Sequence, residues 1–264
     1  MKKPIHRLVV KVGTSTLTYA AGNINYRRLS RLVEVLSDIS NSGVQLVLVS
    51  SGAIAVGVGK LGLPARPADV PGRQAAAAVG QSELMFLYDK FFSEYSKITS
   101  QMLLTGSDME DPERRGHLVN TFEKLLSFGS LPIVNENDSV SVEEIVHGDN
   151  DCLSAQVAAL IGADALAILT DIDGLYDGDP RKDPRARRIA VVEEITPEIA
   201  AAAGGAGSER GTGGMATKLR AAQIATAAGV DTYVLSGTPS DNLYALLEGR
   251  DIGTLFCAKK EETT

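Results

Sequence analysis

The chain has 264 residues, of which 44% are hydrophobic and 22% charged. Such a chain can bury a substantial core in one or two domains. Its 33 acidic side chains outnumber 26 lysines and arginines, for a net charge of −7, which argues against binding nucleic acid through its phosphates. Aromatic residues make up only 5%, which argues against a surface that stacks on bases. We therefore expect no nucleic-acid partner.

Hydropathy and cysteine content indicate a cellular compartment. No apolar run approaches the roughly 20 residues of a membrane span. The apolar run 8–10, which follows a basic start, is too short for a signal peptide. The two cysteines, Cys152 and Cys257, fit neither a disulfide framework nor a metal-binding motif. These features predict a cytoplasmic protein with no membrane partner.

Short β-branched runs alternate with longer helical patterns along the chain. In chain order, strands are expected at residues 8–12, 44–49, 98–104, 131–134, 165–169 and 232–235. Helices are expected over 29–36, 74–92, 112–128, 151–161 and from about 215, with a long exposed loop at 171–188 and an irregular stretch at 204–214. Several strands are apolar throughout, which is typical of burial on both faces. The alternation predicts an α/β protein, a three-layer αβα sandwich around a mostly parallel sheet.

Small, polar or acidic segments follow four of the expected strands, and a sheet of this kind binds ligands outside the carboxyl ends of its strands. The segments are Lys11-Val12-Gly13-Thr14-Ser15, Ser50-Ser51-Gly52-Ala53, Asn135-Glu136-Asn137-Asp138 and Thr170-Asp171. Glycine lets backbone N–H groups approach anionic oxygens, and a following helix N-terminus adds a favourable dipole. Together the segments predict a site for a phosphate-bearing ligand.

A fifth segment, residues 211–218, has the same character, because glycines precede an expected helix whose first turn carries Lys218. From spacing alone, phosphate binding and a flexible loop with a solvated lysine are equally favoured. Residues 57–62 match G-x-G-x-x-G but begin well after the strand ends, so a dinucleotide role is disfavoured. The basic cluster at 181–188 is interrupted by Asp183 and Pro184 and is better explained as a solvated loop.

The densest polar segment runs from Asn135 to Asp151 and opens directly onto an amphipathic helix. Capping that helix needs one residue, whereas the segment offers many. Asn137, Asp138, Asp149 and Asn150 together would suit a ligand that carries an ammonium group as well as carboxylates. Magnesium would be a competing use of the same carboxylates.

Taken together, these motifs resemble the glutamate 5-kinases, a branch of the amino acid kinase family. They occur in that family's order and cover the chain from Lys11 to Phe256. One departure is Cys152, where the family commonly has asparagine. Many members continue into a PUA domain, whereas residues 1–264 are expected to form a single amino acid kinase domain without one.

The resemblance implies ATP-dependent phosphorylation of the γ-carboxylate of L-glutamate, the first step of proline biosynthesis. It implies that Lys11 and Lys218 hold phosphoryl oxygens in the transition state and that Asp151 orients both lysines. The glutamate-binding positions would be Ser51, Gly52, Asn135, Asn137, Asp138, Asp149 and Asn150. The ATP-binding positions would be Lys11, Gly13, Thr170, Asp171, Gly211, Thr212, Gly213, Gly214, Met215, Thr217 and Lys218.

The resemblance further implies that Mg²⁺ bridges the ATP phosphates, without indicating a protein ligand for the metal. It also implies feedback inhibition by L-proline and a homo-oligomer, a dimer or a tetramer. A carboxylate acceptor has a reference pKa of about 4.3, so it is ionised at neutral pH and needs no general base. Two alternatives remain: another kinase of this fold acting on acetylglutamate, aspartate, carbamate or a nucleoside monophosphate, and a non-catalytic nucleotide or amino-acid sensor.

Overall fold

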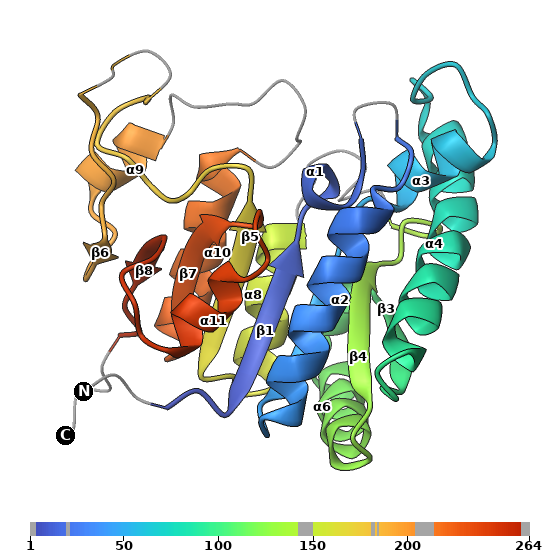
Figure 1. Cartoon of the computed structure of the whole chain (residues 1–264), viewed down its shortest axis with the longest axis horizontal. Helices are drawn as coiled ribbons and strands as arrows, with labels where there is room; N and C mark the ends of the chain where they lie inside the picture. Colours follow the sequence, from blue (N-terminus) through green and yellow to red (C-terminus); the bar gives the residue numbers. More distant parts are fainter. Residues whose placement is uncertain are drawn as a thin grey trace.

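The structure is a computed structural model that describes residues 4–19, 22–141, 150–180, 183, 185–203 and 214–259. These residues form a central sheet between two helical layers (Figure 1). In spatial order, the strands are β3 (Thr99–Leu104), β4 (Leu131–Glu136), β2 (Gln45–Ser50), β1 (Arg7–Val12), β5 (Ala165–Thr170), β7 (Asp231–Ser236), β8 (Thr254–Phe256) and β6 (Val191–Val192). Neighbouring strands from β3 to β7 pair in parallel, whereas β8 is antiparallel to β7 and parallel to β6.

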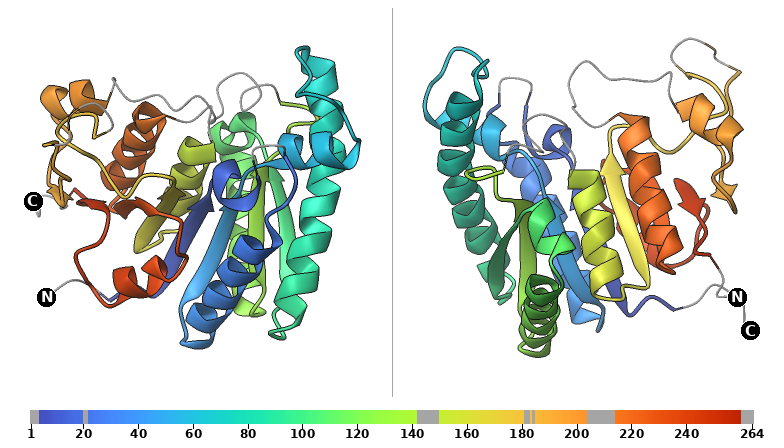
Figure 2. Two further views of the ribbon diagram at one scale, coloured as in Figure 1. Left: turned by 45° about the horizontal axis from the view of Figure 1, so that its top comes forward. Right: turned by 180° about the vertical axis from the view of Figure 1, so that it is seen from behind.

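Strand β1 lies at the centre of the sheet and separates two hydrophobic clusters. Its side chains alternate between the faces, as the period of two requires. Leu8, Val10 and Val12 pack in one cluster with α2 (Tyr26–Asn41), α3 (Ala53–Lys60), α4 (Val70–Ser93) and α11 (Asn242–Leu247). Val9 packs in the other with α5 (Gly106–Glu110), α6 (Pro112–Ser127), α8 (Asn150–Leu160) and α10 (Met215–Ala227). The right view of Figure 2, seen from behind, shows α6, α8 and α10 in front of the sheet, on the face opposite α2.

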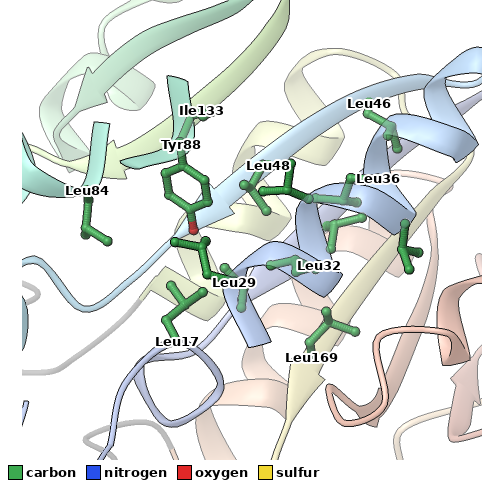
Figure 3. Close-up of a cluster of buried hydrophobic side chains, with 14 of the residues drawn as sticks. Leu17, Leu29, Leu32, Leu36, Leu46, Leu48, Leu84, Tyr88, Ile133 and Leu169 are labelled. Atoms are coloured by element: carbon green, nitrogen blue, oxygen red, sulfur yellow. The ribbon is translucent and has the colours of Figure 1, made fainter. Parts of the chain in front are cut away.

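Side chains cap the N-termini of helices α2 and α6. Asn25 accepts a hydrogen bond from the backbone N–H of Arg28 and caps α2, whose leucines at the expected 3–4-residue spacing pack on β2 (Figure 3). Asp111 caps α6 by accepting from the N–H groups of residues 113 and 114, and Pro112 occupies the first helical position. These caps satisfy backbone donors that a helix N-terminus leaves without intrahelical partners.

The six expected strands are confirmed, each within two residues of its predicted ends. Strands β6 and β8 were not predicted, because two or three residues are too few to carry a pattern. The expected helices are confirmed as α2, α4, α6, α8 and α10. The shorter helices α1 (Thr14–Leu17), α3, α5, α9 (Pro197–Ala203) and α11 were not predicted. None of the described helices is long and apolar enough to cross a membrane.

Two local expectations are resolved by packing. The described residues of the loop at 171–188 are irregular, as predicted, but they are not all exposed: Leu175 is buried, and its N–H donates to Thr254 Oγ1 over 2.8 Å. The glycines of the rejected dinucleotide motif lie in and after α3. A Cβ atom on Gly57 would stand 1.8 Å from the carbonyl oxygen of Ala76 in α4. Gly57 therefore lets two helices approach backbone to backbone, which explains this glycine without a nucleotide.

Candidate active site

The strand ends that the sequence singled out lie along one edge of the sheet. The carboxyl ends of β1, β2, β4 and β5 point to this edge, because these strands are parallel. Helices α8 and α10 begin at the same edge, which lies at the top of Figure 1. Two helix N-termini at one edge provide backbone N–H groups and a favourable dipole for anions.

At the centre of this edge, two lysines contact one carboxylate. Lys11 lies two residues beyond Val9 on β1, so its side chain points to the face covered by α8 and α10. Its Nζ lies 2.7 Å from Oδ1 of Asp151, in the first turn of α8. Lys218, in the first turns of α10, places its Nζ 3.1 Å from Oδ2 of the same carboxylate. The exposed fractions of Lys11, Asp151 and Lys218 are 8%, 0% and 6%.

The electrostatics of this trio favour an anionic ligand. Burial by itself would raise the pKa of Asp151, but the charges of Lys11 and Lys218 outweigh it and hold that pKa well below the ordinary 3.8. Burial lowers the pKa of Lys218, and the charge of Asp151 opposes this effect. Two ammonium groups and one carboxylate give the trio a net positive charge. A phosphoryl group is an anion that would be attracted to this partly desolvated place.

Asp151 is held in place by hydroxyl groups as well as by the lysines. Thr217 Oγ1 lies 2.8 Å from Asp151 Oδ2, and Ser154 Oγ donates to the Asp151 carbonyl oxygen over 2.6 Å. Thr217 was expected at the ATP site, and the structure places its hydroxyl against the carboxylate that joins the two lysines. Gly214 is the N-cap of α10 and Met215 its buried first residue, so both stand where phosphates would meet this helix.

A second polar group lies beside the trio, around Asn150. Its Nδ2 lies 2.9 Å from the Ser50 carbonyl oxygen, 3.0 Å from Ser51 Oγ and 2.8 Å from Asn135 Oδ1. Its own Oδ1 is buried and has no hydrogen-bond partner within the described residues. Such an oxygen is costly to leave unsatisfied, so it offers an acceptor for a ligand N–H group. Gly52 follows with φ near +99°, a left-handed conformation that favours glycine.

Asp138 provides a negative charge close to these amides. Its side chain is buried, and Oδ1 has no hydrogen-bond partner in the described part of the chain. Burial raises its pKa to about 6, against the opposing influence of the positive charge of Arg66. The preceding residue, Asn137, ties the loop to the sheet, because its N–H donates to the Leu104 carbonyl oxygen over 2.7 Å. A buried carboxylate of this kind suits a ligand ammonium group.

Of the remaining expected residues, those that the structure describes lie beside the lysines. A Cβ atom on Gly13 would stand 3.8 Å from Lys11 Nζ, so a side chain there would narrow the space beside that ammonium group. Thr170 Oγ1 donates to Asp171 Oδ1 over 3.1 Å at the end of β5, and the charge of Asp171 acts on Lys218. Asp149, Gly211, Thr212 and Gly213 fall outside the described residues.

Several polar side chains of this edge were not anticipated. Tyr88 is fully buried in α4, and its hydroxyl lies 2.9 Å from Ser50 Oγ. Gln81, in the same helix, accepts from Asn135 Nδ2 over 2.8 Å, and the positive charge of Arg66, in the loop before α4, acts to lower the pKa of Asp138. No local motif marks these positions. A polar residue on the inward face of an otherwise apolar helix is the one signal that could have pointed to Gln81.

Among the described residues, no group of three or more His, Cys, Asp or Glu side chains could hold a metal ion. Both carboxylate oxygens of Asp151 already face lysines. Mg²⁺ commonly binds through the phosphates of a nucleotide and water, a mode that needs no cluster of protein ligands.

Residues 6–236 match the model of the amino acid kinase family. The chain belongs to this family. Within the amino acid kinases, it is 53% identical to "Glutamate 5-kinase" of Clostridium perfringens over 98% of both chains. It is 52% identical to the protein of the same name from Listeria welshimeri, over 97% of this chain and 94% of the relative. Among solved structures, the UMP kinase from Bacillus anthracis superposes with a TM-score of 0.64 over 98% of both chains at 16% identity, which shows a shared fold.

Proposed function

We propose that this chain transfers the γ-phosphoryl group of ATP to the γ-carboxylate of L-glutamate. An oxygen of that carboxylate bonds to the γ-phosphorus while the bond from phosphorus to the β–γ bridging oxygen breaks. The products are γ-glutamyl phosphate and ADP. The observation that carries this assignment is the convergence of Lys11 and Lys218 on Asp151, and the near-full-length similarity to glutamate 5-kinases supports the choice of acceptor.

The reaction brings together two anions, so it needs charge neutralisation and alignment more than proton transfer. Lys11 and Lys218 act as the catalytic cations, whose ammonium groups bind the phosphoryl oxygens of the transition state. Asp151 holds both lysines at defined positions without contacting the reacting atoms. Because the acceptor carboxylate is ionised at neutral pH, the absence of a general base from this scheme has no cost.

ATP would lie on the lysine side of the edge, against Gly13, Thr170, Asp171 and the start of α10. When bound, Mg²⁺ would neutralise phosphate charge on the nucleotide. Glutamate would lie on the other side of the trio, with its α-ammonium group near Asp138 and the buried Oδ1 of Asn150. Ser51, Gly52, Asn135 and Asn137 complete this pocket.

The glutamate pocket could also bind an inhibitor that resembles glutamate. L-proline carries the α-carboxylate and a charged amine of glutamate but no γ-carboxylate, so it would occupy the pocket without being phosphorylated. We propose that it inhibits by competing with glutamate.

We further propose that residues 1–264 act as one catalytic domain and assemble as a dimer or a tetramer. A cytoplasmic location agrees with both cysteines being reduced thiols.

An acyl-phosphate trap tests the proposal. The purified protein is incubated with Mg-ATP and hydroxylamine and, in separate reactions, L-glutamate, N-acetylglutamate or L-aspartate. Hydroxylamine converts an acyl phosphate to a hydroxamate, which is measured by colour. We expect hydroxamate with L-glutamate, reduced by L-proline. Hydroxamate with another acceptor alone would reassign the substrate, and ATP binding without turnover on any acceptor would favour a sensor.

A further inference from the structure

The buried amides of the glutamate side form a chain that leads away from the pocket into helix α4. The chain runs from Asn150 through Asn135 to Gln81, and each link is 2.8 Å long. Asn150 and Asn135 are nearly inaccessible, with 2% and 1% exposed, whereas Gln81 is half-buried. The chain therefore connects a pocket residue to a helix that contributes none of the expected ligand contacts.

Backbone groups fix the direction in which these amides point. The Ser50 carbonyl oxygen can only accept, so Asn150 must present its Nδ2 to β2 and turn its Oδ1 away. The Glu136 N–H can only donate, so Asn135 must present its Oδ1, which also accepts from Asn150. The Nδ2 of Asn135 is left facing α4, where Gln81 Oε1 receives it. Each amide thus has one orientation, and Gln81 is the last acceptor in the series.

We propose that Gln81 is a positioning residue for the amino-acid substrate. By accepting from Asn135, it holds that side chain against Asn150 and so fixes the buried Oδ1 of Asn150 at the place where the α-ammonium group of the substrate binds. Among the described residues, Asn135 is the hydrogen-bond partner of Gln81, and no other role for its carbonyl oxygen is evident. This inference rests on the proposed function, because it takes Asn150 to bind glutamate.

Removing the acceptor leaves the Nδ2 of Asn135 unsatisfied in a buried place. Asn135 would rotate to find another acceptor, and its contact with Asn150 would weaken as a result. A displacement of about 1 Å in a substrate-positioning group can cost on the order of 10²-fold in rate. Because Asn150 is also held by Ser50 and Ser51, we expect a smaller effect, of about 10-fold, on the glutamate KM.

The test uses Gln81→Met, which keeps the length and helix propensity of the side chain but removes the amide. Gln156→Met is the matched control, since Gln156 is a half-buried glutamine in α8 whose side chain makes no hydrogen bond to the described residues. We expect Gln81→Met to raise the glutamate KM about 10-fold, with the ATP KM within twofold of the parent and little change in kcat. Gln156→Met should match the parent in all three.

Gln81→Glu keeps a hydrogen-bond acceptor at position 81 but removes the N–H donors of the amide. Its carboxylate can still accept from Asn135, so its glutamate KM should lie closer to the parent value than that of Gln81→Met. An unchanged KM in Gln81→Met, or a larger KM in Gln81→Glu than in Gln81→Met, would overturn the inference. Equal rises in the KM values for glutamate and ATP would indicate general damage to the fold and also overturn it. A parent protein that gives no hydroxamate with glutamate would instead refute the proposed function.

Discussion

Asp138→Asn is expected to stabilise the ligand-free protein above pH 6 while weakening its binding of glutamate. Asp138 is buried with a carboxylate oxygen that has no hydrogen-bond partner among the described residues. Burial raises its pKa from 3.8 to about 6. The ligand-free protein therefore keeps this carboxylate at a cost that the ammonium group of glutamate would relieve. Such a cost is typical of binding sites, where stability is given up for function.

The sign and size of the effect follow from the raised pKa. Well below pH 3.8 Asp138 is protonated in both the folded and the unfolded chain, so its ionisation does not affect stability there. As the pH rises towards 6, the unfolded chain loses this proton first, and the contribution of Asp138 to stability falls. Above pH 6 the difference of about two pKa units corresponds to about 3 kcal/mol. A buried asparagine amide would cost about 1 kcal/mol instead, which leaves a net gain of about 2 kcal/mol.

Thermal unfolding at pH 5 and at pH 8, in buffer without glutamate, measures this gain. For a chain of this size, about 2 kcal/mol corresponds to a rise in Tm of about 4–8 °C at pH 8. The rise should be smaller at pH 5, where Asp138 of the parent is largely protonated. Asp89→Asn, a change on the exposed side of α4, is the control and should leave the difference between the two pH values unchanged.

Asp138→Asn should weaken glutamate binding, although it stabilises the ligand-free protein. The ammonium group of the ligand favours the ionised form of Asp138, so the parent should bind glutamate more weakly as the pH falls below about 6. Asp138→Asn should raise the glutamate KM far more than the ATP KM and should lose this pH dependence. A variant that is less stable than the parent at pH 8, or that raises both KM values equally, would refute the reasoning.

Three further changes test other parts of the structure. Lys218→Met should lower kcat roughly 10²–10³-fold in the hydroxamate assay with the circular dichroism spectrum unchanged, and a smaller loss would contradict its role. Asp151→Asn removes the carboxylate between two buried ammonium groups and should lower the free energy of unfolding in urea by about 3 kcal/mol. Gly57→Ala would push α3 away from α4 and should lower the free energy of unfolding by about 1–3 kcal/mol. Gly116→Ala, with open space around its Cβ position, should not destabilise the protein.

Much of the edge that carries the site could be predicted from strand patterns. Apolar runs end at Val12, Val49, Val134 and Leu169, and the polar residues that follow must share one edge if the strands are parallel. The alternation of β1 even places Lys11 on the face of Val9. These inferences hold because a strand has a period of two and a fixed direction, so local sequence determines where its side chains point.

The meeting of Lys218 with Asp151 could not be derived in this way. Residues 211–218 are compatible with a phosphate loop and with a solvated one, and spacing favoured neither. Which alternative is correct depends on the tertiary structure. Helices α8 and α10 lie side by side on the same face of the sheet, and this brings the first turns of both helices to β1 (Figure 2). Arg66 and Gln81 were missed for the same reason, because each acts on the site from another part of the chain and neither lies in a local motif.

The first turn of α8 joins the two halves of the site. Asn150 contacts the ends of β2 and β4 on the glutamate side, and the next residue, Asp151, contacts the two lysines on the phosphate side. Consecutive residues of one helix cannot move independently, so in the proposed complex this turn would couple the position of the amino acid to that of the migrating phosphoryl group. In-line transfer requires the separation between the two to be held closely. Under the proposed function, the buried hydrogen bonds around Asn150 therefore place the amino acid, and the ion pairs around Asp151 place the lysines that bind the phosphoryl group.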